Sequence, residues 1–229
     1  MAEKTLVQTQ ENAEAVIAKA KDFWTRNGKI ISIICVVVVL GVAGYFVYNN
    51  YIVKPKQEKA VDALYKAEDY YRKDSINLAL NGDGQYLGFL KVADKFSGTD
   101  AGNLACFYAG SCYIKLDDNP NAIKYLNKFD TDSKPLLARK YKLLGDASGD
   151  LGKTADAVDY YKKAARAFED DKETSAEALF LAAYMTDKVL KNQKEAIELY
   201  KELKKKYPRT TEGYQVDNYL AQLGVYNAE

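Results

Sequence analysis

The chain has 229 residues, 33 basic and 32 acidic side chains, and no histidine. The missing histidine excludes Ser-His-Asp and Cys-His nucleophile pairs and histidine-ligated zinc, and the near balance of charge leaves no electrostatic basis for binding nucleic acid. We therefore expect a protein that is not an enzyme and that has no catalytic residue, no cofactor, no metal ion and no small-molecule substrate. Four prolines and few glycine- or serine-rich runs favour compact helices over disorder.

Residues 1–29 are predicted to be an N-terminal tail on the cytoplasmic side of a membrane. Apolar residues recur in the tail at roughly helical spacing: Val16, Ile17, Ala20, Phe23 and Trp24. Two interpretations stay open. The tail is either an amphipathic helix that lies on the membrane surface or a frayed helical extension of the segment that follows.

Residues 30–48 carry no charged side chain and predict a transmembrane helix. At about 1.5 Å per residue this helix spans roughly 28 Å, which matches one hydrocarbon core. Aromatic residues stand near both ends, where an interfacial belt is expected. They are Phe23, Trp24, Tyr45, Phe46, Tyr48 and Tyr51. A cleaved signal peptide fits poorly, because the segment begins near residue 30, is too long and has no clear small-x-small site after it.

The charges that flank the apolar segment do not decide its orientation. Four basic residues lie within twenty positions before it and four within twenty positions after it: Lys19, Lys21, Arg26 and Lys29, then Lys54, Lys56, Lys59 and Lys66. A short tail followed by a large C-terminal domain is the layout of a signal anchor. The sequence therefore predicts a single-pass protein with a cytoplasmic N-terminus and a C-terminal domain on the opposite side.

The three cysteines do not indicate a disulfide framework. Cys35 lies in the apolar segment, and Cys106 and Cys112 are six positions apart on one predicted helix. Side chains at that spacing point to different helix faces and cannot bridge. We expect them to be small buried hydrophobic residues.

A repeat pattern fills the rest of the chain. Ala122, Ala157 and Ala196 occupy equivalent positions at spacings of 35 and 39, close to the 34-residue period of tetratricopeptide repeats. Each repeat is predicted to be two antiparallel helices that approach closely at Gly110 or Gly145, with a turn such as the one at Gly152.

The repeats extend to both ends of this region. Residues 59–71 and 86–96 predict the two helices of an earlier pair, separated by an unusually long turn. "KFSGTDAG" (95–102) echoes "KYPRTTEG" (206–213), and each carries a threonine that is expected to cap the next helix. Residues 212–223 are predicted to be a C-terminal capping helix.

The predicted fold class is therefore all-α. An N-terminal transmembrane helix is followed by a connector at residues 49–58 and a tetratricopeptide-repeat α-solenoid of about four helix pairs at residues 59–229.

Three stretches carry a family resemblance: "FSGTDAGNLACFYAG", "LLGDASGDLGKTADAVDYYKKA" and "YPRTTEGYQVDNYLAQLG". With the anchor, they make the chain resemble single-pass bacterial tetratricopeptide-repeat proteins, in particular the ancillary subunit of the SecYEG translocon. The resemblance implies a protein of the bacterial inner membrane with a periplasmic repeat domain. It also implies protein partners: Sec translocon subunits, a membrane-anchored periplasmic chaperone of the peptidyl-prolyl isomerase type, and exported clients.

The same resemblance places a protein-binding groove on the first helix of each repeat. Its predicted residues are Phe107, Ser111, Ile114, Arg139, Lys142, Asp146, Phe180 and Tyr184. A mixed apolar and polar groove suits an extended peptide or a partner helix. Two other functions stay open for an anchored repeat protein. One is a scaffold for assembly of the cell wall or outer membrane, and the other is a receptor that faces the cytoplasm.

Overall fold

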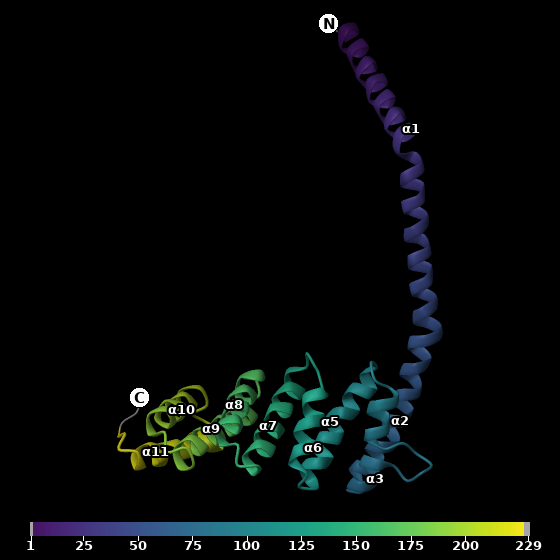
Figure 1. Cartoon of the computed structure of the whole chain (residues 1–229). Helices are drawn as coiled ribbons and strands as arrows, with labels where there is room; N and C mark the ends of the chain where they lie inside the picture. The colour runs from purple at the N-terminus through teal and green to yellow at the C-terminus, as the bar shows by residue number, and fades with distance from the viewer. Residues whose placement is uncertain (1, 227–229) are drawn as a thin grey trace. The chain divides into compact units, whose positions relative to one another are not determined.

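The computed structural model describes residues 2–226, with side chains described from Val16 onward. The first residue of the predicted tail and the last three residues of the predicted repeat domain lie outside the described residues. The chain forms two compact units, Met1–Pro55 and Lys56–Glu229. All regular elements within residues 2–226 are helices, as the sequence predicts, and no strand occurs there (Figure 1).

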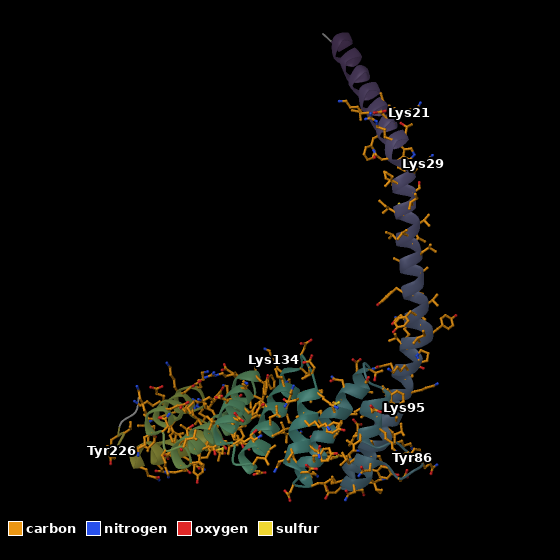
Figure 2. All side chains as sticks on the ribbon, viewed as in Figure 1. Lys21, Lys29, Tyr86, Lys95, Lys134 and Tyr226 are labelled. Carbon is orange, nitrogen blue, oxygen red and sulfur yellow. The ribbon has the colours of Figure 1, made fainter. Side chains whose placement is uncertain are left out.

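The first unit contains α1 (Ala2–Tyr48), followed by a short π-helix, η1 (Asn49–Val53). The apolar side chains of α1 project on every side of the helix (Figure 2). Val36 is 57% exposed and Leu40 is 66% exposed. Full burial of one such side chain stabilises a protein by about 1.5–3 kcal/mol, so exposure of the whole segment to water would be unfavourable. The helix is long and apolar enough to cross a membrane.

The second unit is a series of helical hairpins, seen as successive pairs in Figure 1. Its helices are α2 (Lys54–Arg72, which begins just before the unit), α3 (Ile76–Asn81), α4 (Phe89–Lys95), α5 (Asp100–Lys115), α6 (Asn119–Lys128), α7 (Lys134–Asp150), α8 (Thr154–Ala167), α9 (Lys172–Lys188), α10 (Gln193–Lys206) and α11 (Thr211–Gln222). Helices that follow each other pack together, as α5 does with α6, α7 with α8 and α9 with α10.

Each hairpin turns in the same way. A residue with positive φ lies five positions before a fully buried alanine in every turn. The pairs are Asp74 and Ala79, Asp117 and Ala122, Gly152 and Ala157, and Lys191 and Ala196. In the first three turns the next residue donates its N–H to the carbonyl five positions earlier, at 2.9 Å, which closes the end of the first helix. The shared turn confirms four helix pairs.

Close helix contact depends on two glycines, as the sequence predicts. A Cβ atom on Gly110 would lie 2.6 Å from Leu126, and one on Gly145 would lie 2.7 Å from Tyr161. Because Leu126 and Tyr161 come from the second helix of the same repeat, any larger residue would push the two helices apart.

The repeated threonine motif forms the same structure at both sites. Thr99 accepts a hydrogen bond from the Gly102 amide at 3.0 Å, and Thr210 accepts one from the Gly213 amide at 3.1 Å. A Cβ atom at Gly102 would lie 2.2 Å from the carbonyl oxygen of Phe96. The predicted caps and the alignment of α5 with α11 are therefore confirmed.

The first repeat corrects one prediction. The segment expected to be a long turn contains α3, where Ala79 and Leu80 are buried. Ala79 and Phe89 are ten positions apart, whereas the equivalent Ala196 and Tyr200 are four apart, so six residues have been inserted. The two ends of the inserted loop lie side by side, because an isolated β-bridge joins Gly82 to Leu87. Together α3 and α4 form the second helix of the first repeat.

Both ends of the stack carry polar outer faces. Four residues of α5 that pack toward the first repeat are buried: Ala101, Ala105, Ala109 and Cys112. Forty-three positions earlier, α2 has Glu58, Asp62, Lys66 and Asp69. At the other end, α11 exposes Gln215, Asn218 and Gln222 where α5 has Leu104, Phe107 and Ser111. These polar replacements are typical of capping repeats, and they confirm α11 as the predicted capping helix.

Candidate protein-binding groove

The predicted groove residues lie on the first helices of successive repeats. These helices are neighbours: α5 contacts α7, and α9 contacts α11. Counted back from the positive-φ turn residue, Phe107 and Lys142 share one register position, and Ser111 and Asp146 share another. The same positions in the first repeat are Leu64 and Glu68, so α2 extends the register by one helix.

The structure removes Phe107 and Ser111 from the candidate surface. Their side chains are only 5% and 6% exposed. The Phe107 ring lies 5.2 Å from the ring of Phe129 and belongs to a buried cluster with Leu144 of α7. The Ser111 hydroxyl donates to the Phe107 carbonyl at 3.0 Å. Phe107 therefore packs against the next repeat, whereas the buried Ser111 is bonded to its own helix.

Charged residues connect α7 to α9 in the middle of the candidate surface. The Lys142 ammonium lies 3.6 Å from a carboxylate oxygen of Asp146 and 3.3 Å from one of Glu177. Asp146 also accepts a hydrogen bond from the Tyr161 hydroxyl at 2.8 Å. Burial, followed by the negative charge of Asp146, raises the pKa of Tyr161. Arg139 is exposed one turn before Lys142 and is therefore accessible to a partner.

Aromatic residues form the C-terminal part of the candidate surface. The Phe180 ring lies 5.2 Å from the ring of Tyr219, and the Tyr184 ring lies 6.2 Å from it in an edge-on arrangement. Tyr184 is 40% exposed, and the ammonium of Lys188 lies 5.9 Å from the centre of the Tyr219 ring. Such a surface can stack against apolar or planar groups of a bound segment.

Two tyrosines beside candidate groove residues are not among the predicted ones: Tyr108 of α5, whose ring lies 5.9 Å from that of Phe107, and Tyr219 of α11, which contacts Phe180 and Tyr184. Tyr108 stacks on Phe89 with ring centres 5.0 Å apart, and Tyr219 stacks on Tyr200 at 5.3 Å. Tyr108 and Tyr219 each lie twelve positions after the aromatic residue, Phe96 or Tyr207, that closes the preceding helix. That equal spacing was a signal that could have identified both. Ile114, the remaining predicted residue, is half-buried on α5.

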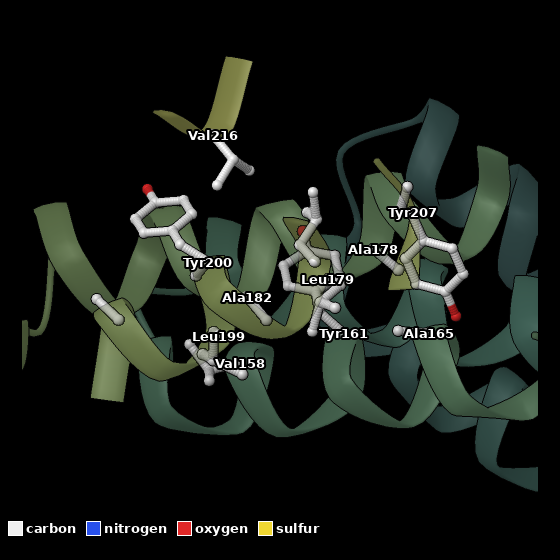
Figure 3. Packing of buried hydrophobic residues seen from close by; sticks show 14 of the residues in the cluster. Val158, Tyr161, Ala165, Ala178, Leu179, Ala182, Leu199, Tyr200, Tyr207 and Val216 are labelled. Carbon is white, nitrogen blue, oxygen red and sulfur yellow. The ribbon is translucent and has the colours of Figure 1, made fainter. Parts of the chain in front are cut away.

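Buried tyrosines behind the groove differ in their hydrogen bonding. Figure 3 shows Tyr161 beside Leu179 and the Tyr200 ring near Val216 of α11. The Tyr161 hydroxyl is bonded to Asp146, whereas the Tyr200 hydroxyl is fully buried with no hydrogen-bond partner. Burial is the main cause that raises the pKa of Tyr200.

The two cysteines of the repeats are buried, as predicted. Cys112 is fully buried on α5, and burial raises the pKa of its thiol to about 12. Cys106 is 8% exposed, and its thiol lies 3.6 Å from the Gly102 carbonyl oxygen. Both thiols therefore stay protonated and act as packing residues. Among the described residues, no group of three or more cysteines and carboxylates is arranged to hold a metal ion.

Comparison with known families agrees with this geometry. The family described as a tetratricopeptide repeat-like domain matches residues 21–134, and the family described as a tetratricopeptide repeat matches residues 177–210. The first match includes both the apolar segment of α1 and the first helix pairs. No curated protein matches the chain. Repeats of this kind are protein-interaction scaffolds, and the matches show that this chain carries tetratricopeptide-like repeats.

Proposed function

We propose that this chain is a non-enzymatic adaptor that is anchored in a membrane by one helix and binds protein partners through its repeats. The observation that carries the proposal is the pairing of two features in one chain. A helix that is apolar on every face precedes a stack of tetratricopeptide-like repeats with capped ends. The proposed organisation is a tail at residues 1–29, a transmembrane helix at 30–48, a connector at 49–58 and the repeat domain at 59–229.

The proposed contact surface follows the first helices of the repeats. It consists of Ile114, Arg139, Lys142, Asp146, Phe180 and Tyr184, together with Tyr108 and Tyr219. The middle of this surface carries charges of both signs, and its C-terminal part is aromatic. An extended peptide or amphipathic helix with charged and apolar side chains would find complementary groups along it.

The most specific form of the proposal is an accessory subunit of the Sec protein-export machinery. It places the protein in the bacterial inner membrane, with the tail in the cytoplasm and the repeats in the periplasm. There the groove would bind a membrane-anchored chaperone or emerging clients. The resemblance of the three repeat stretches and the anchor to the translocon's ancillary subunit supports this form. The family match at residues 21–134 supports only the coarser proposal, a repeat protein with an apolar helix before its repeats.

Affinity purification from native membranes in mild detergent tests the partner. Full-length protein should recover translocon pore subunits and a membrane-anchored chaperone. The double variant Arg139→Glu and Tyr184→Ala should recover much less of both. Lys201→Glu is the matched control, because Lys201 is exposed on α10, the second helix of its repeat. This variant should recover normal amounts of the pore subunits and the chaperone. Recovery of cell-wall or outer-membrane assembly factors instead would replace the Sec proposal with the scaffold alternative.

Cysteine labelling tests the topology. Single cysteines placed at exposed Asp170 in the repeats and at Lys21 in the tail are treated in intact cells with a reagent that does not cross the inner membrane. The native cysteines are buried in the repeats or lie in the proposed membrane segment. Labelling at residue 170 and protection at residue 21 are expected. The opposite pattern would establish a cytoplasm-facing receptor.

A further inference from the structure

An open cleft of about 720 Å³ lies between α4 and α6, the second helices of the first two repeats, and the first turns of α5. The two loops that follow α4 and α6 form part of its walls. Cys106 of α5 lines it together with Tyr125 and Lys128 of α6. None of the candidate groove residues lines it, so the cleft is a separate feature of the repeat unit.

The third repeat has a tyrosine where this cleft has a cysteine. Cys106 lies eleven positions before Asp117, the positive-φ residue of its turn, and Tyr141 lies eleven positions before the equivalent Gly152. The Tyr141 ring stacks on the ring of Tyr160, with ring centres 6.4 Å apart. An aromatic ring therefore occupies, in the third repeat, the position at which the second repeat has only a thiol.

The other two members of that stack are present in the second repeat. Tyr125 and Tyr160 each lie three positions after the buried alanine of their helix, and Lys128 and Lys163 each lie six positions after it. The Lys163 ammonium lies 5.3 Å from the centre of the Tyr160 ring and 5.9 Å from that of Tyr141. The Lys128 ammonium lies 5.0 Å from the centre of the Tyr125 ring. The second repeat therefore keeps the tyrosine and the lysine of its second helix but lacks the ring from its first helix.

A short second helix leaves the cleft open, and a fixed loop forms its wall. α6 has 10 residues and α8 has 14, although both begin two positions after the positive-φ residue of their turn. The chain that follows α6 is held against α5 by the side-chain amide of Asn103. This amide donates to the Asp130 carbonyl at 2.6 Å and accepts from the Asp130 N–H at 3.0 Å. Because these two hydrogen bonds fix the wall, a ligand does not have to open the cleft.

The charges around the cleft are of both signs. The carboxylates that line it are those of Asp94, Asp100, Asp130 and Asp132. Lys128 also lines it, and four further lysines lie beside its walls: Lys56, Lys95, Lys124 and Lys140. Net charge therefore does not select the ligand. The features that can select it are the place for a ring, the Tyr125 side chain and the cation of Lys128.

We propose that this cleft binds an aromatic side chain of a partner protein, which takes the place that Tyr141 has in the third repeat. Its ring would pack against Tyr125 beside the Lys128 ammonium, in the space that the small Cys106 side chain leaves free. Ring packing and the cation–π interaction favour an aromatic side chain over an aliphatic one.

The size and the rim of the cleft suit a protein segment. A cleft of about 720 Å³ holds more than one ring, so residues that flank the aromatic side chain would enter with it. Ser97 and Thr131 line the cleft and offer hydroxyl groups to the backbone of such a segment. The inference rests on the proposed adaptor role and adds to it a second contact site with a stated chemistry.

Selection of displayed peptides tests the proposal. A library of short random peptides is first depleted on the variant Cys106→Tyr and then selected on the unsubstituted full-length protein, both in lipid nanodiscs. The substitution fills the cleft as Tyr141 does in the third repeat, so depletion removes peptides that bind elsewhere, including those that bind the groove. The remaining peptides should share a tyrosine, phenylalanine or tryptophan. Replacement of that residue by leucine in synthetic peptides should weaken binding by about tenfold, as measured by fluorescence anisotropy.

Variants of the full-length protein identify the site. Cys106→Tyr should weaken binding of the selected peptides by about tenfold or more, whereas Cys106→Ala leaves the cleft open and should retain the affinity. Lys128→Gln removes the cation and should weaken binding by about threefold. Lys163→Gln removes the equivalent cation of the third repeat and should leave the affinity unchanged. Both lysines are exposed, so this pair still tests the site if circular dichroism shows that Cys106→Tyr does not fold.

Several results would overturn the proposal. They are no enrichment of peptides after depletion, equal binding of the aromatic and leucine peptides, or equal affinities of the Lys128→Gln and Lys163→Gln variants. Binding of N-acetyl-tyrosinamide as tight as that of the peptides would also overturn it, because the site would then take a free aromatic molecule. A change of oligomeric state in Cys106→Tyr would do the same, because a second copy would then occupy the cleft. These failures differ from failure of the adaptor proposal, which would appear as loss of groove-dependent partners in affinity purification.

Discussion

Removal of a hydroxyl group from two buried tyrosines should have opposite effects on stability. The Tyr161 hydroxyl donates to the Asp146 carboxylate at 2.8 Å. Its loss in Tyr161→Phe should lower the free energy of unfolding by about 1.5 kcal/mol, the lower end for a bond to a charged group, because Asp146 is partly solvated. The Tyr200 hydroxyl is buried without a partner, so Tyr200→Phe should raise the free energy of unfolding by about 1 kcal/mol.

Urea unfolding of a fragment covering residues 56–229, followed by circular dichroism, measures both effects. Tyr214→Phe is the matched control, because Tyr214 is 72% exposed. It should change stability by less than about 0.5 kcal/mol. A loss of stability in Tyr200→Phe would refute the reasoning, since it would mean that the hydroxyl is satisfied in solution.

The same two tyrosines predict how stability depends on alkaline pH. Burial is the main cause that raises the pKa of each hydroxyl above its ordinary value of 10.0. A raised pKa in the folded state stabilises the fold below the pKa of the unfolded state, and this stability is lost as pH rises. Stability of the unsubstituted fragment should therefore fall above about pH 10, and each phenylalanine variant should reduce the slope of that fall.

Further predictions concern the caps, the close contacts and the inserted loop. Thr99→Ala should lower the free energy of unfolding by about 1 kcal/mol. Thr99→Ser should lower it much less, because the serine hydroxyl can still accept the hydrogen bond from the Gly102 amide. Gly145→Ala should cost about 1–3 kcal/mol, because its Cβ would lie 2.7 Å from Tyr161; an unchanged urea midpoint would contradict this packing. Hydrogen bonds from the Tyr86 and Gln85 amides and from the Tyr70 hydroxyl hold the pKa of Asp83 below its ordinary value of 3.8. The order of the loop should therefore persist above that pH and be lost as pH falls below it, which NMR shifts of the Tyr86 amide would detect and which should be absent in Asp83→Asn.

The repeat pattern was predictable because packing repeats the same local demands. Each second helix needs a small residue at Ala122, Ala157 or Ala196, and each close contact needs Gly110 or Gly145. These requirements act within about 35 residues, so spacing alone reveals them. The apolar segment was equally predictable, because a helix that is apolar on every face is either buried in a large core or spans a membrane.

The first repeat was harder to predict because its second helix is divided. Six inserted residues separate α3 from α4, and neither piece is long enough to show helical periodicity by itself. The equivalent stacks of Phe89 on Tyr108 and of Tyr200 on Tyr219 identify the insertion in the structure.

The exposure of the predicted groove residues could be predicted only in part, for a related reason. Register places a residue on a helix face, but it does not tell whether the next helix covers that face. Phe107 and Ser111 share register positions with Lys142 and Asp146, yet the first two are buried and the second two are partly exposed. Large apolar or small side chains at these positions allow close packing of α7, whereas charged ones keep their ends in water.

Site-specific photo-crosslinking in native membranes tests the central claim most directly. A photoreactive amino acid replaces Tyr184 in the groove of the full-length protein, and in a second variant it replaces Glu198, an exposed residue of α10. The account predicts a discrete protein adduct from position 184, and none from position 198. Equal adducts from both positions, or none from position 184 while position 198 reacts, would show that partners do not bind along the first helices of the repeats.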